Sequence, residues 1–310
     1  MARKRGKELT KRISKWLVGL GVVVAIAGCG EENERAGTLS SQERPGQIHP
    51  SAAASVSATN GATSGSAQER WSDEPAPWKN SALYAFLHQT LEEASQPVLP
   101  LGAQRPPDVT ITGKSVGKIF EEVKRRWAEV TFATPSGTLR RPVAVLETEC
   151  GDMEIALWPE VAPNHVRAFV ALAESGYYDG LFFEMRLGER QQDQLPRAIG
   201  GGSPQANAQT AASIGLWLKP EILLPEQAKA RGVRHQAGTV FCHWLGCFFY
   251  IGLNEAPMWD GEFVIFGEVQ RNLGVAERIY DRLAEEADPP QIRRMIIRWH
   301  DTGKLLTDQR

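Results

Sequence analysis

The sequence predicts a mostly β protein in which short antiparallel strands close into a barrel capped at both ends by helices. From Pro142 onward, short apolar runs alternate with tight turns, as in the strands of a sheet. Two amphipathic helices, near residues 164–175 and 274–283, interrupt these runs. Nothing beyond residue 28 is long and apolar enough to cross a bilayer. Many short strands and few helices favour a closed barrel, because closure leaves no sheet edge exposed.

The first 28 residues are expected to be a signal peptide. Lys and Arg precede a short apolar core from Trp16 to Ala27, which is typical of a secretory leader. The run Ile26-Ala-Gly-Cys29 resembles the bacterial lipobox. The resemblance implies an exported protein of the cell envelope, attached to a membrane by acylation of Cys29. Because Gly30 follows this Cys and no Asp does, the outer membrane is expected where the source has two membranes. The alternative is an ordinary signal peptide with an incidental Cys.

Residues 29–77 are expected to form a flexible spacer between the lipid and the folded part. They are rich in Ser, Ala, Gly, Thr, Gln and Glu, and such a segment buries too little apolar surface to offset its ordering entropy. The formal net charge of −2 for 310 residues gives no reason to expect a nucleic-acid partner.

Residues 78–141 are expected to be a helical lead-in. Apolar residues recur at helical spacing over 82–93 and again over 116–130. Gly113-Lys-Ser115 looks like the end of a phosphate-binding loop, but Asp108 stands where that loop needs Gly. We therefore interpret this tripeptide as the start of a helix.

The barrel region, 142–310, contains elements that the pattern predicts in chain order. They are a strand at 143–148, a turn at 150–152, a strand at 153–158, a helix at 164–175 ended by Gly176, strands at 182–185, 238–242, 248–251 and 264–269, a helix at 274–283 and a last strand at 295–300.

Seven segments of this region resemble, in order, the sequence of cyclophilins, the peptidyl-prolyl cis-trans isomerases. Gly151–Phe169 resembles the family's opening strand and helix, and Ile199–Pro204 stands where the family has a Gly-Gly-Asp turn. The other segments are Gly176–Phe183, Gly238–Phe241, Phe248–Ile251, Trp259–Val269 and Ile296–Leu305. The resemblance covers residues 142–306 and implies an eight-stranded antiparallel barrel with two helices. It also implies isomerisation of X–Pro bonds in exported protein chains, with no cofactor and no metal.

The residues that would carry this chemistry differ from the family's pattern. Rotation about an X–Pro bond has a barrier of roughly 18–20 kcal/mol, because the twisted amide loses its resonance. The resemblance implies an Arg aimed at the prolyl nitrogen, a Gln beside it and an aromatic-lined pocket for the Pro ring. In this chain Met185 takes the position of the Arg, and Gly200 that of the Gln. In the same register the substrate-binding residues are Met185, Cys247, Phe249, Met258, Trp259 and Phe263.

Two Arg residues are candidates for the missing cation. Arg197 comes from a polar loop expected to line the groove. Arg186 is adjacent to the right position, although strand alternation points it to the opposite face. The alternative for both is a solvated surface Arg. Two functions therefore stay open, a slow isomerase and a catalytically inactive barrel that has kept its groove as a peptide-binding scaffold. A third interpretation is that the aromatic residues only fill the end of the barrel.

The remaining cysteines suggest a disulfide more than a metal site. Cys242, His243 and Cys247 provide too few ligands for a structural zinc site. In the cyclophilin register the two Cys residues flank a tight hairpin on paired strands. A disulfide between Cys242 and Cys247 is therefore favoured if their Cα atoms are close enough, since export permits such a bridge.

Overall fold

The structure is a computed structural model that describes residues 76–100, 103, 105–189, 195–207, 213–243, 246–285 and 288–307. The chain divides into two compact units, Met1–Asp73 and Glu74–Arg310, and every described residue belongs to the second. The predicted signal peptide, the anchor at Cys29 and nearly all of the predicted spacer lie outside the described residues. Within the described part of the chain, no helix has the length and apolar character that a bilayer span requires.

Eight antiparallel strands form one sheet in the order β3-β4-β6-β5-β7-β2-β1-β8. Their bounds are β1 Thr138–Thr148, β2 Gly151–Leu157, β3 Phe183–Leu187, β4 Ala198–Gly201, β5 Thr239–Cys242, β6 Phe249–Gly252, β7 Val264–Arg271 and β8 Ile292–Leu305. The number of strands and their antiparallel pairing confirm the prediction. β4 was expected to be a turn, because a run of Gly is typical of turns. Here the glycines allow close strand packing instead, since a Cβ on Gly201 would come within 3.0 Å of the Cα of Phe183.

Among the described residues, one isolated bridge joins the chain segments next to the two edge strands of this sheet. β3 and β8 are the edge strands, and Phe182 and Gln291, which lie just before them, form an isolated antiparallel bridge. Two backbone hydrogen bonds flank it, from Phe183 N to Pro290 O at 2.9 Å and from Ile292 N to Leu181 O at 2.8 Å. The edge strands share no ladder, so the closed barrel stays a prediction while the eight-stranded sheet is confirmed.

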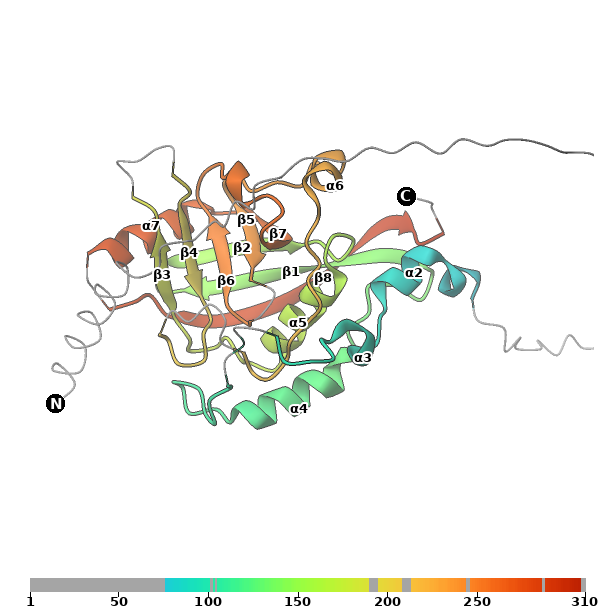
Figure 1. Cartoon of the computed structure of the whole chain (residues 1–310), viewed down its shortest axis with the longest axis horizontal. Coiled ribbons are helices and arrows are strands. Elements are labelled where there is room, and N and C mark those ends of the chain that lie inside the picture. Colours follow the sequence, from blue (N-terminus) through green and yellow to red (C-terminus); the bar gives the residue numbers. More distant parts are fainter. Residues whose placement is uncertain are drawn as a thin grey trace, which may run out of the picture. The chain divides into compact units, whose positions relative to one another are not determined.

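Helices α5, Pro163–Glu174, and α7, Gly274–Ala284, are the two helices predicted for the barrel region. α7 packs against β3 and β4, and α5 packs between the sheet and α4 (Figure 1). The other helical elements are η1 Pro77–Asn80, α2 Ala82–Leu87, α3 Leu91–Ala94, α4 Val116–Trp127, α6 Pro225–Ala230 and η2 Pro257–Trp259. The helix predicted over 82–93 is broken into α2 and α3, because Thr90 forms a capping box with Glu93 and starts a new helix.

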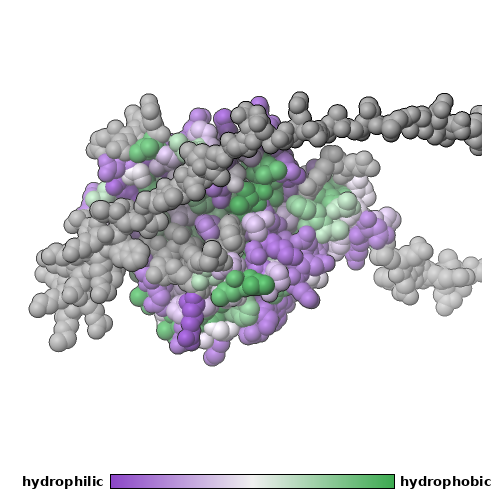
Figure 2. All heavy atoms as spheres, in the orientation of Figure 1, coloured by the Kyte–Doolittle hydropathy of each residue, from purple (hydrophilic) through white to green (hydrophobic). Residues whose placement is uncertain are grey.

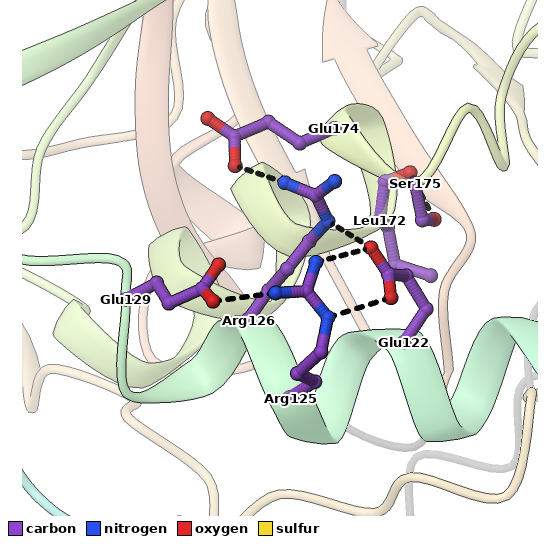
Figure 3. A network of polar contacts seen from close by, with 7 residues as sticks. All are labelled: Glu122, Arg125, Arg126, Glu129, Leu172, Glu174 and Ser175. Atoms are coloured by element: carbon purple, nitrogen blue, oxygen red, sulfur yellow. Dashed lines mark hydrogen bonds and ion pairs between the residues drawn. The ribbon is translucent and has the colours of Figure 1, made fainter.

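The lead-in belongs to the same hydrophobic core as the sheet. Its Leu87, Val123 and Phe132 are fully buried in that core. Arg167 of α5 donates to the carbonyl oxygens of Leu87 and Gln89, each at 2.6 Å. On the outside, a network of Glu122, Arg125, Arg126, Glu129 and Glu174 joins α4 to α5, with Arg126 Nη1 at 3.2 Å from Glu174 Oε2 (Figure 3). Exposed ion pairs contribute little, so the buried contacts hold the lead-in in place.

Both ends of α5 are held by distant segments. At its start, Glu221 accepts from the backbone N–H groups of Asn164, at 3.1 Å, and His165, at 2.9 Å, which satisfies free donors at a helix N-terminus. After its end, Lys114 Nζ donates to the carbonyl oxygens of Gly176 and Asp179.

The tripeptide Gly113-Lys-Ser115 is a helix start, as predicted. The Ser115 hydroxyl caps α4 by accepting a hydrogen bond from the N–H of Lys118.

Candidate functional site

Five residues lie side by side across neighbouring strands on one face of the sheet. Met185 pairs with Gly200, Gly200 with Tyr250, Tyr250 with Phe241, and Phe241 with Ile265. Side chains of directly paired residues lie on the same face of a sheet. We call this set the outer row; it contains Met185, one of the residues that the sequence placed in the groove.

An aromatic wall shares Phe241 and Tyr250 with the outer row and extends beyond it. It consists of Phe241, Phe248, Tyr250, Trp259 and Phe263. The rings of Phe241 and Tyr250 stack with centroids 5.1 Å apart, and Phe248 lies 5.0 Å from Tyr250. Trp259 and Phe263 lie 5.3 and 5.4 Å from Phe241. The first three rings are buried, whereas Trp259 and Phe263 are half-buried.

His235 packs edge-on against this wall. Its ring lies 4.8 Å from that of Phe241, and its Nδ1 is 2.8 Å from Oδ1 of Asp260. Burial lowers the pKa of His235, which keeps the ring neutral at pH 7. The carboxylate of Asp260 fixes the orientation of this neutral imidazole, which packs against the wall and adds no positive charge to it.

Phe249, predicted to line the pocket, lies on the other face of the sheet. It is 1% exposed, and its ring contacts those of Phe169 on α5, Tyr178 and Phe183 at 5.5 to 5.8 Å. Tyr250, its neighbour in β6, is the residue in the outer row. Tyr250 was missed because Phe249 was matched to the family's pocket Phe, and a shift of one residue in that register exchanges the two faces.

The positions of the family's polar donors are apolar here. Met185, which stands for the Arg, is a half-buried thioether. A Cβ on Gly200 would collide with the ring of Phe248 and approach Cδ1 of Tyr250 to 3.0 Å. Phe248 therefore fills the space that a side chain at position 200 would need. Neither position donates a hydrogen bond from its side chain.

The two candidate cations both lie over α7. The guanidinium carbon of Arg186 is 4.4 Å from the ring centroid of Tyr280, and that of Arg197 is 5.4 Å from the same ring. Nη1 of Arg197 is also 3.4 Å from Oε2 of Glu277, and its side chain is only 16% exposed. Arg186 thus faces away from Met185, as strand alternation indicated. Arg197 shares its location, contrary to the expectation that it lines the groove.

Cys242 and Cys247 are not joined by a disulfide in this structure. The cross-strand partner of Cys242 is Phe249, so Cys247 is a diagonal neighbour, for which Cα atoms are about 7–8 Å apart. A disulfide needs roughly 4.4–6.8 Å, which explains why the predicted bridge is not formed here. The Sγ of Cys247 instead lies 2.9 Å from the hydroxyl of Tyr177, and burial raises the pKa of Cys247 to about 12.

Both thiols line a cavity of about 40 Å³ together with Phe249 and His165. This cavity lies between α5 and the sheet, on the face opposite the outer row. Cys247 was predicted to bind substrate; its side chain lies on this inner side. The remaining predicted residues, Met258, Trp259 and Phe263, do lie together, and Met258 is 54% exposed.

Glu184, the residue before Met185 in β3, has a buried carboxyl group. Its Oε1 accepts from the N–H of Ser203 at 3.0 Å. Its Oε2 is buried and has no hydrogen-bond partner among the described residues. Burial raises the pKa of Glu184 to about 8, so this carboxyl group is mostly protonated at neutral pH.

The molecule is thus an eight-stranded antiparallel sheet with helices packed against it and an aromatic wall on one face. Residues 143–301 match the family model "Cyclophilin type peptidyl-prolyl cis-trans isomerase/CLD". The chain belongs to this family of cyclophilin-type peptidyl-prolyl cis-trans isomerases. The seven segments identified in the sequence are thereby confirmed as a family resemblance.

Relatives of the chain carry the same family name. A peptidyl-prolyl cis-trans isomerase-like 1 of Rhizopus delemar is 30% identical over 140 residues, which are 45% of this chain and 80% of that protein. A peptidyl-prolyl cis-trans isomerase-like 2 of Gibberella zeae is 28% identical over 44% of this chain. The chain spans only 22% of that second relative's length. A solved cyclophilin of Cryptosporidium parvum matches 51% of this chain and 98% of its own, with 20% identity and a TM-score of 0.42.

Proposed function

We propose that this protein is a slow cyclophilin-type peptidyl-prolyl isomerase that acts on Pro-containing segments of exported proteins. The observation that carries the proposal is the aromatic wall next to the outer row. Trp259 and Phe263 are half-buried, and Met258 is largely exposed beside them. Such a surface takes up a Pro ring with little need for polar contacts.

The expected rate is low because the groove has lost its donors. An apolar wall removes water from the X–Pro amide. The planar amide is polarised by resonance and loses more hydration energy than the twisted amide, so desolvation lowers the barrier to rotation. Preorganised hydrogen-bond donors supply most of the remaining rate enhancement in such a site. The loss of one donor commonly costs about 10²–10³ in rate. Met185 and the Gly200–Phe248 pair provide none. Catalysis by desolvation alone is therefore weak.

A second function is peptide binding without isomerisation. The placement of Arg186 and Arg197 over Tyr280 favours it, because neither guanidinium then faces the outer row. A scaffold or holdase needs apolar walls and no cation at the prolyl nitrogen. This function and the slow isomerase use the same groove and differ only in the rate.

A protease-coupled isomerisation assay on a Pro tetrapeptide decides between them. The purified protein is compared with a Met258→Ala variant and with an Arg197→Ala variant. A rate above the spontaneous one that falls in Met258→Ala identifies a slow isomerase. A rate equal to the background, with peptide binding that Met258→Ala weakens, identifies the binding function. Absence of both binding and rate at high protein concentration contradicts the use of this groove.

The place of action is proposed to be the cell envelope, with a lipid on Cys29. The basic leader, the short apolar core and Ile26-Ala-Gly-Cys29 support it. Growth of an expressing bacterium with a labelled fatty acid is expected to label the native protein and not a Cys29→Ala variant. A native protein that stays unlabelled, with its leader still attached, contradicts export by this route.

A further inference from the structure

Exposed carboxylates lie close in the chain to the exposed apolar residues at the end of the aromatic wall. Met258 and Leu224 are 54% and 63% exposed. Glu226, Glu255 and Glu262, all exposed, stand next to them in the chain. We call these three residues the acidic rim. Figure 2 shows apolar residues gathered on the face that carries α6 and the ends of β5 and β7, with polar residues around them.

The segments that carry the rim are packed against each other. Met258 and Trp259 belong to η2, and the turn after η2 is closed by a hydrogen bond from Glu262 N to Trp259 O at 3.0 Å. The ring of Pro225, which starts α6, lies 3.5 Å from the place that a Cβ on Gly261 would take. The start of α6 and the turn after η2 are therefore in contact, and Glu226 and Glu262 lie on these two segments beside the exposed end of the aromatic wall.

The basic groups near the rim balance it only in part. Arg234 lies 3.8 Å from Glu255, with both side chains more than half exposed, so solvent weakens this pair. Lys229 lies one turn after Glu226 on α6. Arg231 donates a hydrogen bond to the carbonyl oxygen of Glu160. Asp260 adds a further carboxylate, which holds His235.

The imidazoles on this face add no compensating charge at pH 7. Burial lowers the pKa of both His235 and His243. Near η2 and the start of α6, the four carboxylates Glu226, Glu255, Asp260 and Glu262 thus stand beside Lys229, Arg231 and Arg234, and Arg231 is bonded to the carbonyl oxygen of Glu160.

We propose that the groove selects Pro-containing segments in which Lys or Arg lies next to the Pro. This proposal rests on the proposed use of the groove for Pro segments and names their chemical class. The aliphatic part of Lys or Arg lies on apolar surface such as Met258 and Leu224, while the charged end reaches a carboxylate of the rim. Trp259 adds an aromatic face for the cation. Opposite charge at a rim mainly provides specificity and faster association.

Binding of three fluorescent hexapeptides tests the selectivity. They are identical except that Lys, Gln or Glu flanks the Pro, and affinities are measured at low and at high salt. The Lys peptide is expected to bind about 5–10-fold more tightly than the Gln peptide and the Glu peptide most weakly. This spread shrinks at high salt, because exposed charges are screened.

Substitutions of the rim assign the effect to its residues. In a Glu255→Gln, Glu262→Gln double variant the Lys preference falls to about twofold or less, while the affinity for the Gln peptide is unchanged. Glu92→Gln, an exposed carboxylate on α3, is the matched control and keeps the full preference. Equal binding of all three peptides overturns the charge selectivity and leaves the groove in use. Failure of every peptide to bind, in a protein that unfolds cooperatively, overturns the proposed function itself.

Discussion

At the scale of single residues, burial sets the chemistry of Glu184. Its Oε1 is bonded to the N–H of Ser203, and its Oε2 has no partner among the described residues. Burial raises the pKa of Glu184 to about 8, from its ordinary value of 4.5. The native state therefore holds a proton that the unfolded chain releases above about pH 4.5. Stability from this group is present at low pH and is lost as the pH rises toward 8.

A Glu184→Gln substitution isolates this contribution. The amide keeps an oxygen for the N–H of Ser203 and carries no charge. The free energy of unfolding of the variant is expected to exceed that of the native protein by about 1–3 kcal/mol at pH 8.5 and to equal it near pH 4.5. Denaturant unfolding at the two pH values measures the difference. A variant that is equally destabilised at both contradicts a protonated Glu184.

Arg197 and Arg186 are expected to matter for stability and not for the groove. Arg197→Ala removes the contact with Tyr280 and the pair with Glu277, and is expected to cost about 1 kcal/mol. Peptide affinity and any isomerase rate should stay within about twofold of the native values. Met258→Ala, which removes exposed groove surface, is the positive control and should weaken peptide binding several-fold. Loss of activity in Arg197→Ala with unchanged stability would instead place its guanidinium at the substrate.

At the scale of elements, strand register decided which site residues were predicted correctly. The segment order, the antiparallel strands and the positions of α5 and α7 follow from alternation and helical spacing alone. Met185 and Gly200, which the sequence placed together in the groove, are paired across β3 and β4. Phe249 was assigned the role that the strand pairing gives to Tyr250, because the family register was taken one residue out of step and alternation then reverses the faces. β4 was missed because its glycines have no side chains to show a pattern.

His88 links α2 to the chain that enters β1. Its Nδ1 donates to the carbonyl oxygen of Tyr84 at 2.9 Å, and its Nε2 accepts from the N–H of Phe132 at 3.1 Å. Burial lowers the pKa of His88 to about 4. Below about pH 6.5 the imidazole of His88 takes up a proton in the unfolded chain but stays neutral in the native protein. Stability is therefore lost as the pH falls from 6.5 toward 4.

Thermal unfolding at pH 7 and pH 5 measures this effect. The native protein is expected to lose about 1 kcal/mol through His88 between the two, after allowance for its partial exposure. A His88→Gln variant is less stable at pH 7 but loses less on acidification. His235 also has a lowered pKa, so only the difference between the variant and the native protein is assigned to His88. If the variant loses as much stability between pH 7 and pH 5 as the native protein does, His88 does not have this role.

At the scale of the whole molecule, the lead-in and the sheet share one core. The sequence predicted two helices before the barrel, and their apolar faces, but helical spacing does not show what a face packs against. Arg167, Lys114 and Glu221 each join α5 to a segment far away in the chain. Such long-range partners leave no local trace in the sequence.

A fragment of residues 142–310 is therefore expected to fold poorly. It lacks Leu87, Val123 and Phe132, which are fully buried, and burial of each such side chain contributes about 1.5–3 kcal/mol. Several such losses approach the total stability of a domain. Circular dichroism and hydrogen exchange of this fragment, beside residues 74–310, provide the comparison. A cooperative transition of the fragment at the same temperature would show that the lead-in is dispensable.

Phe248 and Gly200 also constrain how this groove can evolve. A Gln at position 200 would collide with the ring of Phe248, and a smaller residue at 248 alone would leave a void above Gly200. Each single change is thus expected to lower stability, and only the pair makes room for a polar donor. The two positions form a case of sign epistasis. A library that varies one residue at a time would miss the route back to a polar groove, whereas joint variation of 200 and 248 would contain it.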